Sequence, residues 1–406
     1  MASRAAAPTV QNRNPQPSDA GNGKAAPAPI PFTRAARRKS IQAYTKTFTL
    51  SAGSTTAVEP IELPAAGFIR DLEVYVQIAS SGNSATVANP AVGDLPWNVL
   101  NNIQVTNAAG DTIYVPINGY QLYLINKYGG IYPPPNCDPR ADQVFVATTT
   151  GAGATAGTGA FLLRIPFEVD PRDAFCSLPN LAANKAYQVL INFASIAQVW
   201  AGGTAPNGAV TVTLTIVMNY WSQPNAANGD GYPQQTTPDG VGSVSLFRFQ
   251  TLANIGGGNK VMQLVNVGNV IRWMVFTLYD TASPNIRTDA QWSPTNYFRL
   301  NNDQLFYKPL TFWLSQMKQA YNYGTAAGAK DVAGALDTGV YSLTDFIQQH
   351  GNVQVDSPRD QYLVTLDSTL LQLEGSQFGA TANNLFVLSN EIKPVSAAAL
   401  YALNIV

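Results

Sequence analysis

Charged residues are scarce in this chain of 406 residues. Asp, Glu, Lys and Arg make up 12% of it, about half of the roughly 25% that is usual for soluble domains. An isolated monomer usually needs surface charge to stay in solution. The low charge therefore suits a molecule that hides much of its surface against neighbouring chains.

Histidine and cysteine are almost absent, which limits the chemistry open to the chain. The only histidine, His350, cannot form a His-based metal cluster within one chain, and a Ser/His/Asp triad would depend on it. We interpret it as a surface or turn residue. The two cysteines, Cys137 and Cys176, form no C-x-x-C pair and no disulfide framework. They predict synthesis in a reducing compartment and packing as small apolar side chains.

Long apolar runs are missing as well. The N-terminus lacks the apolar stretch of a secretory signal, and no run of 18 apolar residues is present. We therefore expect neither secretion nor a membrane-spanning helix, and we expect the chain to be made and kept in a cytoplasm.

Alternation of apolar and polar residues dominates the chain beyond residue 40 and predicts strands. In the clearest stretch, Val210, Leu214 and Met218 share one face while Thr211 and Thr215 lie on the other. Clusters of Gly, Pro, Asn and Asp, which supply turn geometry, separate the candidates. The expected strands span about 43–50, 68–78, 99–106, 111–116, 143–147, 161–168, 186–193, 210–220, 244–251, 261–266, 270–279, 297–307, 361–373, 384–389 and 398–405.

Helical spacing is rare. The apolar residues of two stretches, 120–128 and 310–321, fall on one helix face. A short third helix is expected to begin at Ser342, whose hydroxyl can cap the amide of Asp345. The rest of the chain is expected to be sheet.

An internal repeat is the most informative feature. GFIRDLEVYVQI at 67–78 returns as NVIRWMVFTLYD at 269–280, and each copy is followed by an Asn-containing strand and a helical stretch that ends in Tyr-Gly. The offset is 202 residues at the first match (69 to 271) and 195 at the last (128 to 323). Because the landmarks keep their order, we interpret the chain as two copies of one β-sandwich.

The predicted fold is all-β, with two tandem jelly-roll sandwiches (a double jelly roll) and a few short helices. About eight strands per copy with long connections favour a jelly roll over an up-and-down barrel. The first jelly roll is expected at 41–222 and the second at 243–406. The segment 223–242, rich in Pro and Gly, is interpreted as the linker.

Positive charge is concentrated in residues 1–40. Seven cations stand there against Asp19, which gives 7 − 1 = +6 and leaves −7 for the remainder. The segment has almost no large apolar residues, so we expect a basic arm, disordered or extended, that orders only against a partner. The cations of this arm are Arg4, Arg13, Lys24, Arg34, Arg37, Arg38 and Lys39.

Four stretches resemble the double jelly-roll major capsid proteins of tailless, membrane-containing icosahedral bacteriophages of the tectivirus and corticovirus kind. They are NVLNNIQVTNAAGD at 98–111, NGYQLYLINKYG at 118–129, IPFEVDPRD at 165–173 with LPNL at 178–181, and YLVTLDSTL at 362–370. The likeness spans about residues 40–406, and the order and duplication of the stretches carry it.

The resemblance implies a structural protein of the virion, assembled in the host cytoplasm, with no catalysis and no cofactor. It implies a homotrimer of pseudo-hexagonal outline that tiles a shell over an internal lipid membrane. The implied partners are neighbouring capsomers, penton proteins, minor capsid proteins and the membrane, which the arm would contact through its cations. No specific binding of nucleic acid is implied, and packaged nucleic acid remains the alternative partner of the arm.

Two other classes of function are alternatives to a capsid role. Paired carboxylates can hydrolyse glycosides, and Asp170 and Asp173 form a candidate pair. Arg172 beside them indicates instead a turn held by an ion pair, and Asp356 and Asp360 flank the same kind of turn in the second copy. We therefore do not expect an enzyme.

A soluble two-domain carbohydrate-binding protein or adhesin is the other alternative. It would use exposed aromatic residues, and Tyr132, Tyr232 and Trp292 lie in loop contexts. Most other aromatic side chains fit core positions in strands or helices. The core set includes Trp273, Phe276, Phe298 and Trp313.

Overall fold

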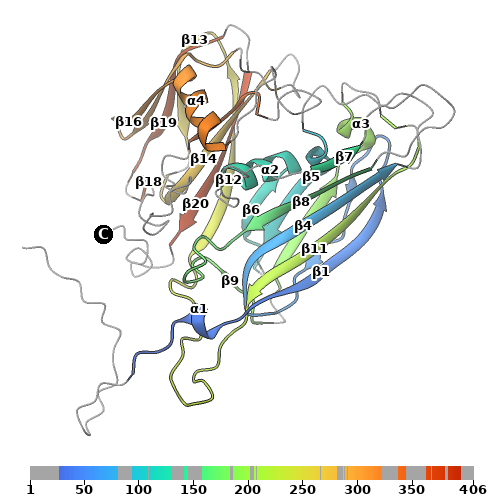
Figure 1. Cartoon of the computed structure of the whole chain (residues 1–406). Coiled ribbons are helices and arrows are strands. Elements are labelled where there is room, and N and C mark those ends of the chain that lie inside the picture. Colours follow the sequence, from blue (N-terminus) through green and yellow to red (C-terminus); the bar gives the residue numbers. More distant parts are fainter. Residues whose placement is uncertain are drawn as a thin grey trace, which may run out of the picture.

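The computed structural model of the chain describes most of both repeats. The described residues are 27–80, 94–107, 109–129, 141–144, 158–182, 186–201, 205–206, 208–265, 267–280, 287, 289, 291–321, 337–343, 363–366, 368–379 and 383–394. Two β-sandwiches, coloured blue to green and yellow to red in Figure 1, follow one another along the chain. The expected strand at 398–405 lies outside the described residues.

The first sandwich, called the first barrel here, consists of two sheets. One has the order β1-β11-β4-β8-β7, with β9 beside β4, and the other places β2, β3, β10, β5 and β6 together. Its strands are β1 (Arg38–Thr49), β2 (Thr56–Ala57), β3 (Ile61–Glu62), β4 (Phe68–Ser80), β5 (Leu100–Thr106), β6 (Thr112–Ile117), β7 (Ala141–Val144), β8 (Thr158–Pro166), β9 (Leu178–Pro179), β10 (Gln188–Phe193) and β11 (Val210–Trp221).

The second barrel repeats this plan. One sheet has the order β12-β20-β14-β17, with β18 beside β14, and the other has the order β13-β19-β15-β16. Its strands are β12 (Val244–Ile255), β13 (Gly258–Leu264), β14 (Val270–Asp280), β15 (Thr295–Leu300), β16 (Asp303–Pro309), β17 (Val340–Leu343), β18 (Leu363–Val364), β19 (Leu371–Phe378) and β20 (Asn383–Lys393).

The strand pairings confirm the duplication that the sequence predicts. Ile69 on β4 and Ile271 on β14 both lie beside the last strand of their own barrel, opposite Tyr220 and Glu391 respectively. The ladder slips by one residue immediately afterwards in both copies, between 69 and 71 and between 271 and 273. An extra residue at one position of a pair is a β-bulge, and the repeated Ile-Arg pair places an arginine there in each copy.

Helices are few and short. The predicted helices are confirmed as α2 (Gly119–Tyr128) and α4 (Leu310–Tyr321), which follow β6 and β16. Asn118 caps α2 because its side chain accepts from the amide of Gln121 at 2.8 Å. The remaining helices are α1 (Phe32–Ala35), α3 (Ile196–Val199) and the 3₁₀ helix η1 (Trp97–Val99).

Two sequence expectations are wrong in detail. Ser342 lies within strand β17, whose residues are all buried, instead of starting a helix, and the rest of the expected helix, from residue 344 on, lies outside the described residues. The strand expected at 297–307 is a hairpin, β15 and β16, that turns at Asn301 and Asn302. Both asparagines have positive φ angles, 52° and 97°, and tight hairpin turns favour Asn and Gly for this reason.

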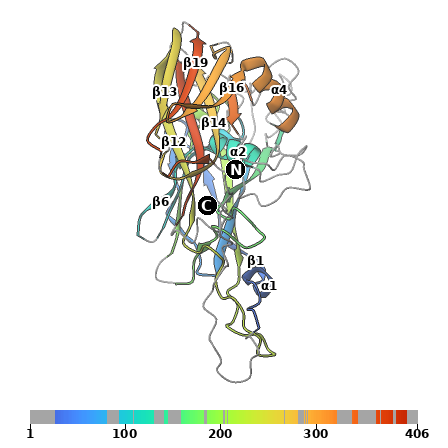
Figure 2. The same cartoon turned by 90° about the vertical axis from the view of Figure 1, so that its left-hand side faces the viewer.

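The two barrels share one core. Strand β6 of the first barrel lies parallel to β12 of the second at Tyr114 and Phe247, so their sheets join into one of ten strands. Buried apolar side chains from both barrels form a single contiguous cluster. Figures 1 and 2 show α2 where the barrels meet, with α4 on the second barrel. The chain therefore forms one block instead of two separately moving domains.

The beginning of the described chain is anchored to the first barrel. Strand β1 starts at Arg38, ahead of the expected start at residue 43. Phe32 is 2% exposed and its ring lies 5.2 Å from the ring of Phe68 and 6.2 Å from that of Trp221. Residues 27–37 are thus part of the folded molecule, and a deletion of residues 1–39 would remove the first two residues of β1.

Replacing Phe32 with Ala tests this anchor. Loss of a buried Phe side chain typically costs about 3–5 kcal/mol, and the position near the chain end lets neighbours relax, so we expect about 2–3 kcal/mol here. Urea unfolding followed by circular dichroism measures the change. Thr33→Ala, which removes only a bond at 2.8 Å to the carbonyl of Arg172 on the surface, serves as the control with little change.

Candidate assembly surfaces

A buried ion pair joins the two barrels. Lys127, in the last turn of α2, donates to the Asp337 carboxylate at 2.8 Å, and the side chains are 1% and 3% exposed. The hydroxyl of Tyr128 donates to the other carboxylate oxygen at 2.8 Å. Charges removed from water are stable only when they are paired and hydrogen-bonded. This contact therefore fixes the relative position of the barrels.

A second buried pair lies at the same junction. Arg287 of the second barrel donates through Nη2 to Asp94 of the first at 2.8 Å and through Nη1 to the carbonyl of Thr338 at 2.6 Å. The guanidinium also stands 4.4 Å from the ring centre of Tyr120 on α2. Burial raises the pKa of Asp94, and the neighbouring guanidinium opposes that rise. The pair acts as a structural clamp between the barrels.

Aromatic rings fill the rest of the junction. The rings of Tyr114 and Phe247 stack with centres 4.2 Å apart, and Phe247 also meets Trp273 at 5.9 Å. Tyr128 on α2 meets Tyr321 on α4 at 4.8 Å. Such pairs add about 0.5–1.5 kcal/mol each beyond the area that they bury. Aromatic contacts therefore help to hold the two barrels together at the junction.

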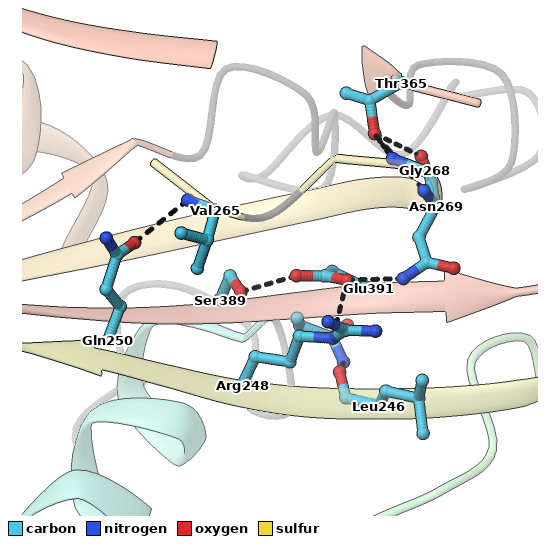
Figure 3. A network of polar contacts seen from close by, with 10 residues as sticks. Leu246, Arg248, Gln250, Val265, Gly268, Asn269, Thr365, Ser389 and Glu391 are labelled. Atoms are coloured by element: carbon cyan, nitrogen blue, oxygen red, sulfur yellow. Dashed lines mark hydrogen bonds and ion pairs between the residues drawn. The ribbon is translucent and has the colours of Figure 1, made fainter. Parts of the chain in front are cut away.

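Glu391 on β20 is the centre of a buried polar network in the second barrel (Figure 3). Its carboxylate accepts from Asn269 at 2.7 Å and from Ser389 at 2.9 Å, and Arg248 lies 3.1 Å away. The hydroxyl of Thr365 in turn donates to the carbonyl of Asn269 at 2.7 Å. The network connects β12, β14 and β20 to the residues after β18 and has a structural role.

The predicted basic arm is placed only in part. Arg34, Arg37, Arg38 and Lys39 are all exposed at one end of the first barrel, while Arg4, Arg13 and Lys24 lie outside the described residues. The amide of Arg37 donates to Ser222 at 2.9 Å, and the guanidinium of Arg38 stands 4.8 Å from the ring centre of Trp221. Four cations therefore project from a fixed base beside the expected linker.

The polypeptide that follows β11 supports this base. The amide of Ile30 donates to the carbonyl of Pro233 at 2.9 Å, and that of Gln235 donates to the carbonyl of Ile30 at 3.0 Å. Gln235 also accepts from the amide of Phe32 at 2.9 Å. The expected linker thus pairs with the start of the described chain, which the sequence pattern did not indicate.

The candidate catalytic residues form structural contacts where they are described. Asp170 accepts from the amide of Arg172 at 2.9 Å and pairs with its guanidinium at 3.2 Å, so the predicted turn is confirmed. Asp173 accepts from the amide of Phe175 at 3.2 Å. Cys176 is buried, and burial raises the pKa of its thiol well above the ordinary value. His350, Cys137, Asp356 and Asp360 lie outside the described residues.

Neither a metal centre nor a spanning helix emerges from the described part of the chain. Within those residues, His, Cys, Asp and Glu do not gather in groups of three or more that could hold an ion. No helix among them is both long and apolar enough to cross a membrane.

The aromatic residues mostly pack inside. Trp273, Phe276, Phe298 and Trp313 are buried, as the strand and helix patterns predict. The suggestion that Trp292 could be exposed is wrong, because its ring is 4% exposed and stacks on Tyr341 with centres 4.2 Å apart. Tyr232 is exposed, and Tyr132 lies outside the described residues. Tyr75, Tyr307 and Phe312 are exposed as well, each on a strand or helix of the sandwiches.

Known proteins similar to this chain are found by comparing structures and not by comparing sequences. No family model matches the sequence, and no curated protein matches it either. The major capsid protein (MCP) of STIV is similar in structure, with a TM-score of 0.57, 13% identity, and coverage of 88% of this chain and 97% of that one.

Two further solved structures are similar over nearly the same range. A chain of Sulfolobus Turreted Icosahedral Virus has a TM-score of 0.60 and 12% identity, covering 90% of this chain and 93% of its own. A chain of the PBCV-1 virus capsid has a TM-score of 0.52 and 12% identity, covering 88% and 93% respectively. At these identities the likeness shows the fold. The chain has the double jelly-roll fold of viral major capsid proteins.

Proposed function

We propose that this chain is the major capsid protein of an icosahedral virus, a structural protein of the virion shell without catalysis of its own. The observation that carries the proposal is similarity over both barrels and their junction, 88–90% of the chain, to proteins of viral capsids. The low charge and the continuous core support it, because a shell subunit must be rigid and must bury its sides against neighbours.

Three chains assemble into a homotrimer in this proposal. Six barrels then give a capsomer of pseudo-hexagonal outline, assembled in the host cytoplasm, that contacts neighbouring capsomers and penton and minor capsid proteins. Permanent interfaces commonly bury more than about 2,000 Å², so the trimer should persist on dilution. Size exclusion with light scattering is expected to give three times the chain mass of 43.4 kDa at micromolar and nanomolar concentration. A monomer that binds glycans would contradict the capsid role.

The domain limits belong to the same proposal. Residues 1–40 would act as the arm, 41–222 and 243–406 as the two jelly rolls, and 223–242 as the linker. Strand β1 begins at Arg38 and Phe32 is buried, so the part of this segment from Phe32 onward belongs to the folded molecule. Residues 27–40 are therefore the fixed base of the proposed arm, and residues 1–26 lie outside the described residues.

An internal lipid membrane is the partner that we propose for the arm. Exposed cations attract anionic headgroups by about 1 kcal/mol each near the surface. The fixed base contributes Arg34, Arg37, Arg38 and Lys39, which are all exposed. Arg4, Arg13 and Lys24 would add to them from the arm.

Co-sedimentation of the intact protein and a variant lacking residues 1–26 tests this partner. The intact protein is expected to bind anionic liposomes several-fold more strongly than neutral liposomes and duplex DNA. The truncated protein should stay folded, since Phe32 and β1 are retained, and should bind anionic liposomes less. Equal binding by both forms would remove the arm's role, and a preference for DNA would assign it a different partner.

A further inference from the structure

The segment 27–36, called the strap here, lies across one end of the first barrel, where Figures 1 and 2 show α1. The amide of Ile30 donates to the carbonyl of Pro233 at 2.9 Å, and its carbonyl accepts from the amide of Gln235 at 3.0 Å. The hydroxyl of Thr33 donates at 2.8 Å to a carbonyl of the loop between β8 and β9. These partners belong to the linker and to a loop, so the strap rests on the barrel and outside its sheets.

The strap contributes to a small apolar cluster and not to the main core. Phe32 and Ala36 pack there with Phe68, Ala174 and Trp221. Among the described residues, the contiguous core that the two barrels share contains none of these five. Removal of the strap would therefore uncover the small cluster and leave the shared core intact. Regions with few buried apolar contacts open more readily than core strands do.

The floor beneath Phe32 is held in place without the strap. The indole of Trp221 donates to the carboxylate of Glu168, which also pairs with the guanidinium of Arg70 at 2.9 Å. The guanidinium groups of Arg38 and Arg70 stand 4.8 and 5.2 Å from the centre of the Trp221 ring. All of these groups belong to the barrel, so the pocket keeps its walls when Phe32 leaves it.

We infer that the strap is a detachable unit that opens at its junction with β1, near Arg37, while both barrels stay folded. At that junction Arg37 and Ser222 exchange two hydrogen bonds of 2.9 Å, and β1 then begins. An extended chain spans about 3.3 Å per residue, so release of 27–36 lets the segment before it reach about 33 Å further. The purpose, a longer reach for the arm, rests on the proposed function, whereas the opening itself does not.

Amide hydrogen exchange tests whether the strap opens by itself. The amide of Ala36 donates to the carbonyl of Phe32 at 2.7 Å, so it is protected only while the strap is closed. In the unmodified protein we expect Phe32 and Ala36 to exchange roughly 100-fold faster than Leu214 and Met218 in the β4–β11 ladder. Phe32→Ala should speed exchange in the strap by a further ~30- to 140-fold, equivalent to about 2–3 kcal/mol at 1.4 kcal/mol per tenfold. Thr33→Ala should change it little.

A reversible lock provides the matched control. Ile30 and Gln234 lie opposite each other in an isolated bridge, so Ile30→Cys with Gln234→Cys, in a Cys137→Ser background, is placed to form a disulfide. The oxidised form should slow exchange at Phe32 by about tenfold or more, and the reduced form should exchange like the unmodified protein. Slow exchange at Met218 in both forms shows that the barrel is folded.

The exchange rates decide the inference. Equal rates in the strap and the ladder of the unmodified protein would show that the strap opens only when the barrel unfolds, and would overturn it. Exchange in the strap as fast as in an unfolded peptide would overturn it as well, because the strap would not be closed.

Co-sedimentation with anionic liposomes tests the purpose of the opening. The oxidised lock should bind several-fold less than the reduced form, because the reach of the arm is shorter. Equal binding by the two forms would overturn the role in reach. Binding by neither form would contradict the membrane proposal, while the exchange rates still decide whether the strap opens.

Discussion

Replacing Asp337 with Asn is expected to lower the free energy of unfolding by about 3–5 kcal/mol, because it leaves a buried charge without its partner. The ammonium of Lys127 lies 2.8 Å from the Asp337 carboxylate, and both side chains are almost fully buried. An asparagine keeps the shape and can still accept from Tyr128, so lost charge compensation accounts for most of the effect. Chemical unfolding followed by tryptophan fluorescence gives the number.

Two comparisons separate this cause from others. Replacing both partners, with Lys127→Met and Asp337→Leu, removes the charges together and is expected to recover most of the loss. Glu59→Gln breaks the exposed pair between Glu59 and Lys46, whose side chains are 58% and 48% exposed respectively, and should leave stability nearly unchanged because water screens such pairs. A loss in Asp337→Asn no larger than in Glu59→Gln would contradict the burial of the pair.

Replacing Trp273 with Ala is the second change with a large expected effect. The indole is fully buried at the joint between the barrels and meets Phe247 with ring centres 5.9 Å apart. Truncating a buried Trp typically costs about 3–5 kcal/mol. Since the cavity opens in the core that both barrels share, we expect both barrels to become less stable together.

Calorimetry distinguishes a shared core from two independent ones. The unmodified protein and Trp273→Ala are each expected to unfold in one transition, with the variant at lower temperature. Tyr232→Ala, at a side chain that is 55% exposed, is the control and should unfold like the parent. Two separated transitions, only one of them moved by Trp273→Ala, would show that the barrels fold independently.

The duplication could be predicted from sequence because local patterns encode it. Ile69 and Ile271, each followed by an arginine, mark the same bulge on equivalent strands. Alternation located most strands, since each sheet buries one face and leaves the other polar. The alternation pattern did not predict β17, because both faces of that strand are buried and its residues do not alternate. It also missed the two-residue turn at Asn301 and Asn302, because the residues on both sides of the turn continue the pattern of a single strand.

The joint between the barrels could not be predicted in the same way. Lys127 and Asp337 are 210 residues apart, and Arg287 and Asp94 are 193 apart. No spacing rule connects residues at such separation. One signal was present: Lys127 lies on a helix with six large apolar or aromatic side chains, Tyr120, Leu122, Tyr123, Leu124, Ile125 and Tyr128, and a lysine in such a setting indicates a buried partner. Trp292 was misjudged because its loop folds back onto Tyr341.

For the basic segment, the sequence predicted the charge but not the anchor at Phe32. Its charge was visible in the sequence, but Phe32, with little apolar sequence around it, gave no sign that it anchors to Phe68 and Trp221. The anchor depends on two rings that lie far from Phe32 in the sequence and that the fold of the first barrel brings together. Composition therefore predicted the cations and missed the place where the fixed base begins.

Electron cryomicroscopy of the purified protein tests the central claim most directly, since it shows the number and arrangement of barrels in one particle. The account predicts particles with threefold symmetry and six lobes in a pseudo-hexagonal ring. Single particles with two lobes, or pairs related by a twofold axis, would contradict a capsid protein that builds its shell from trimers.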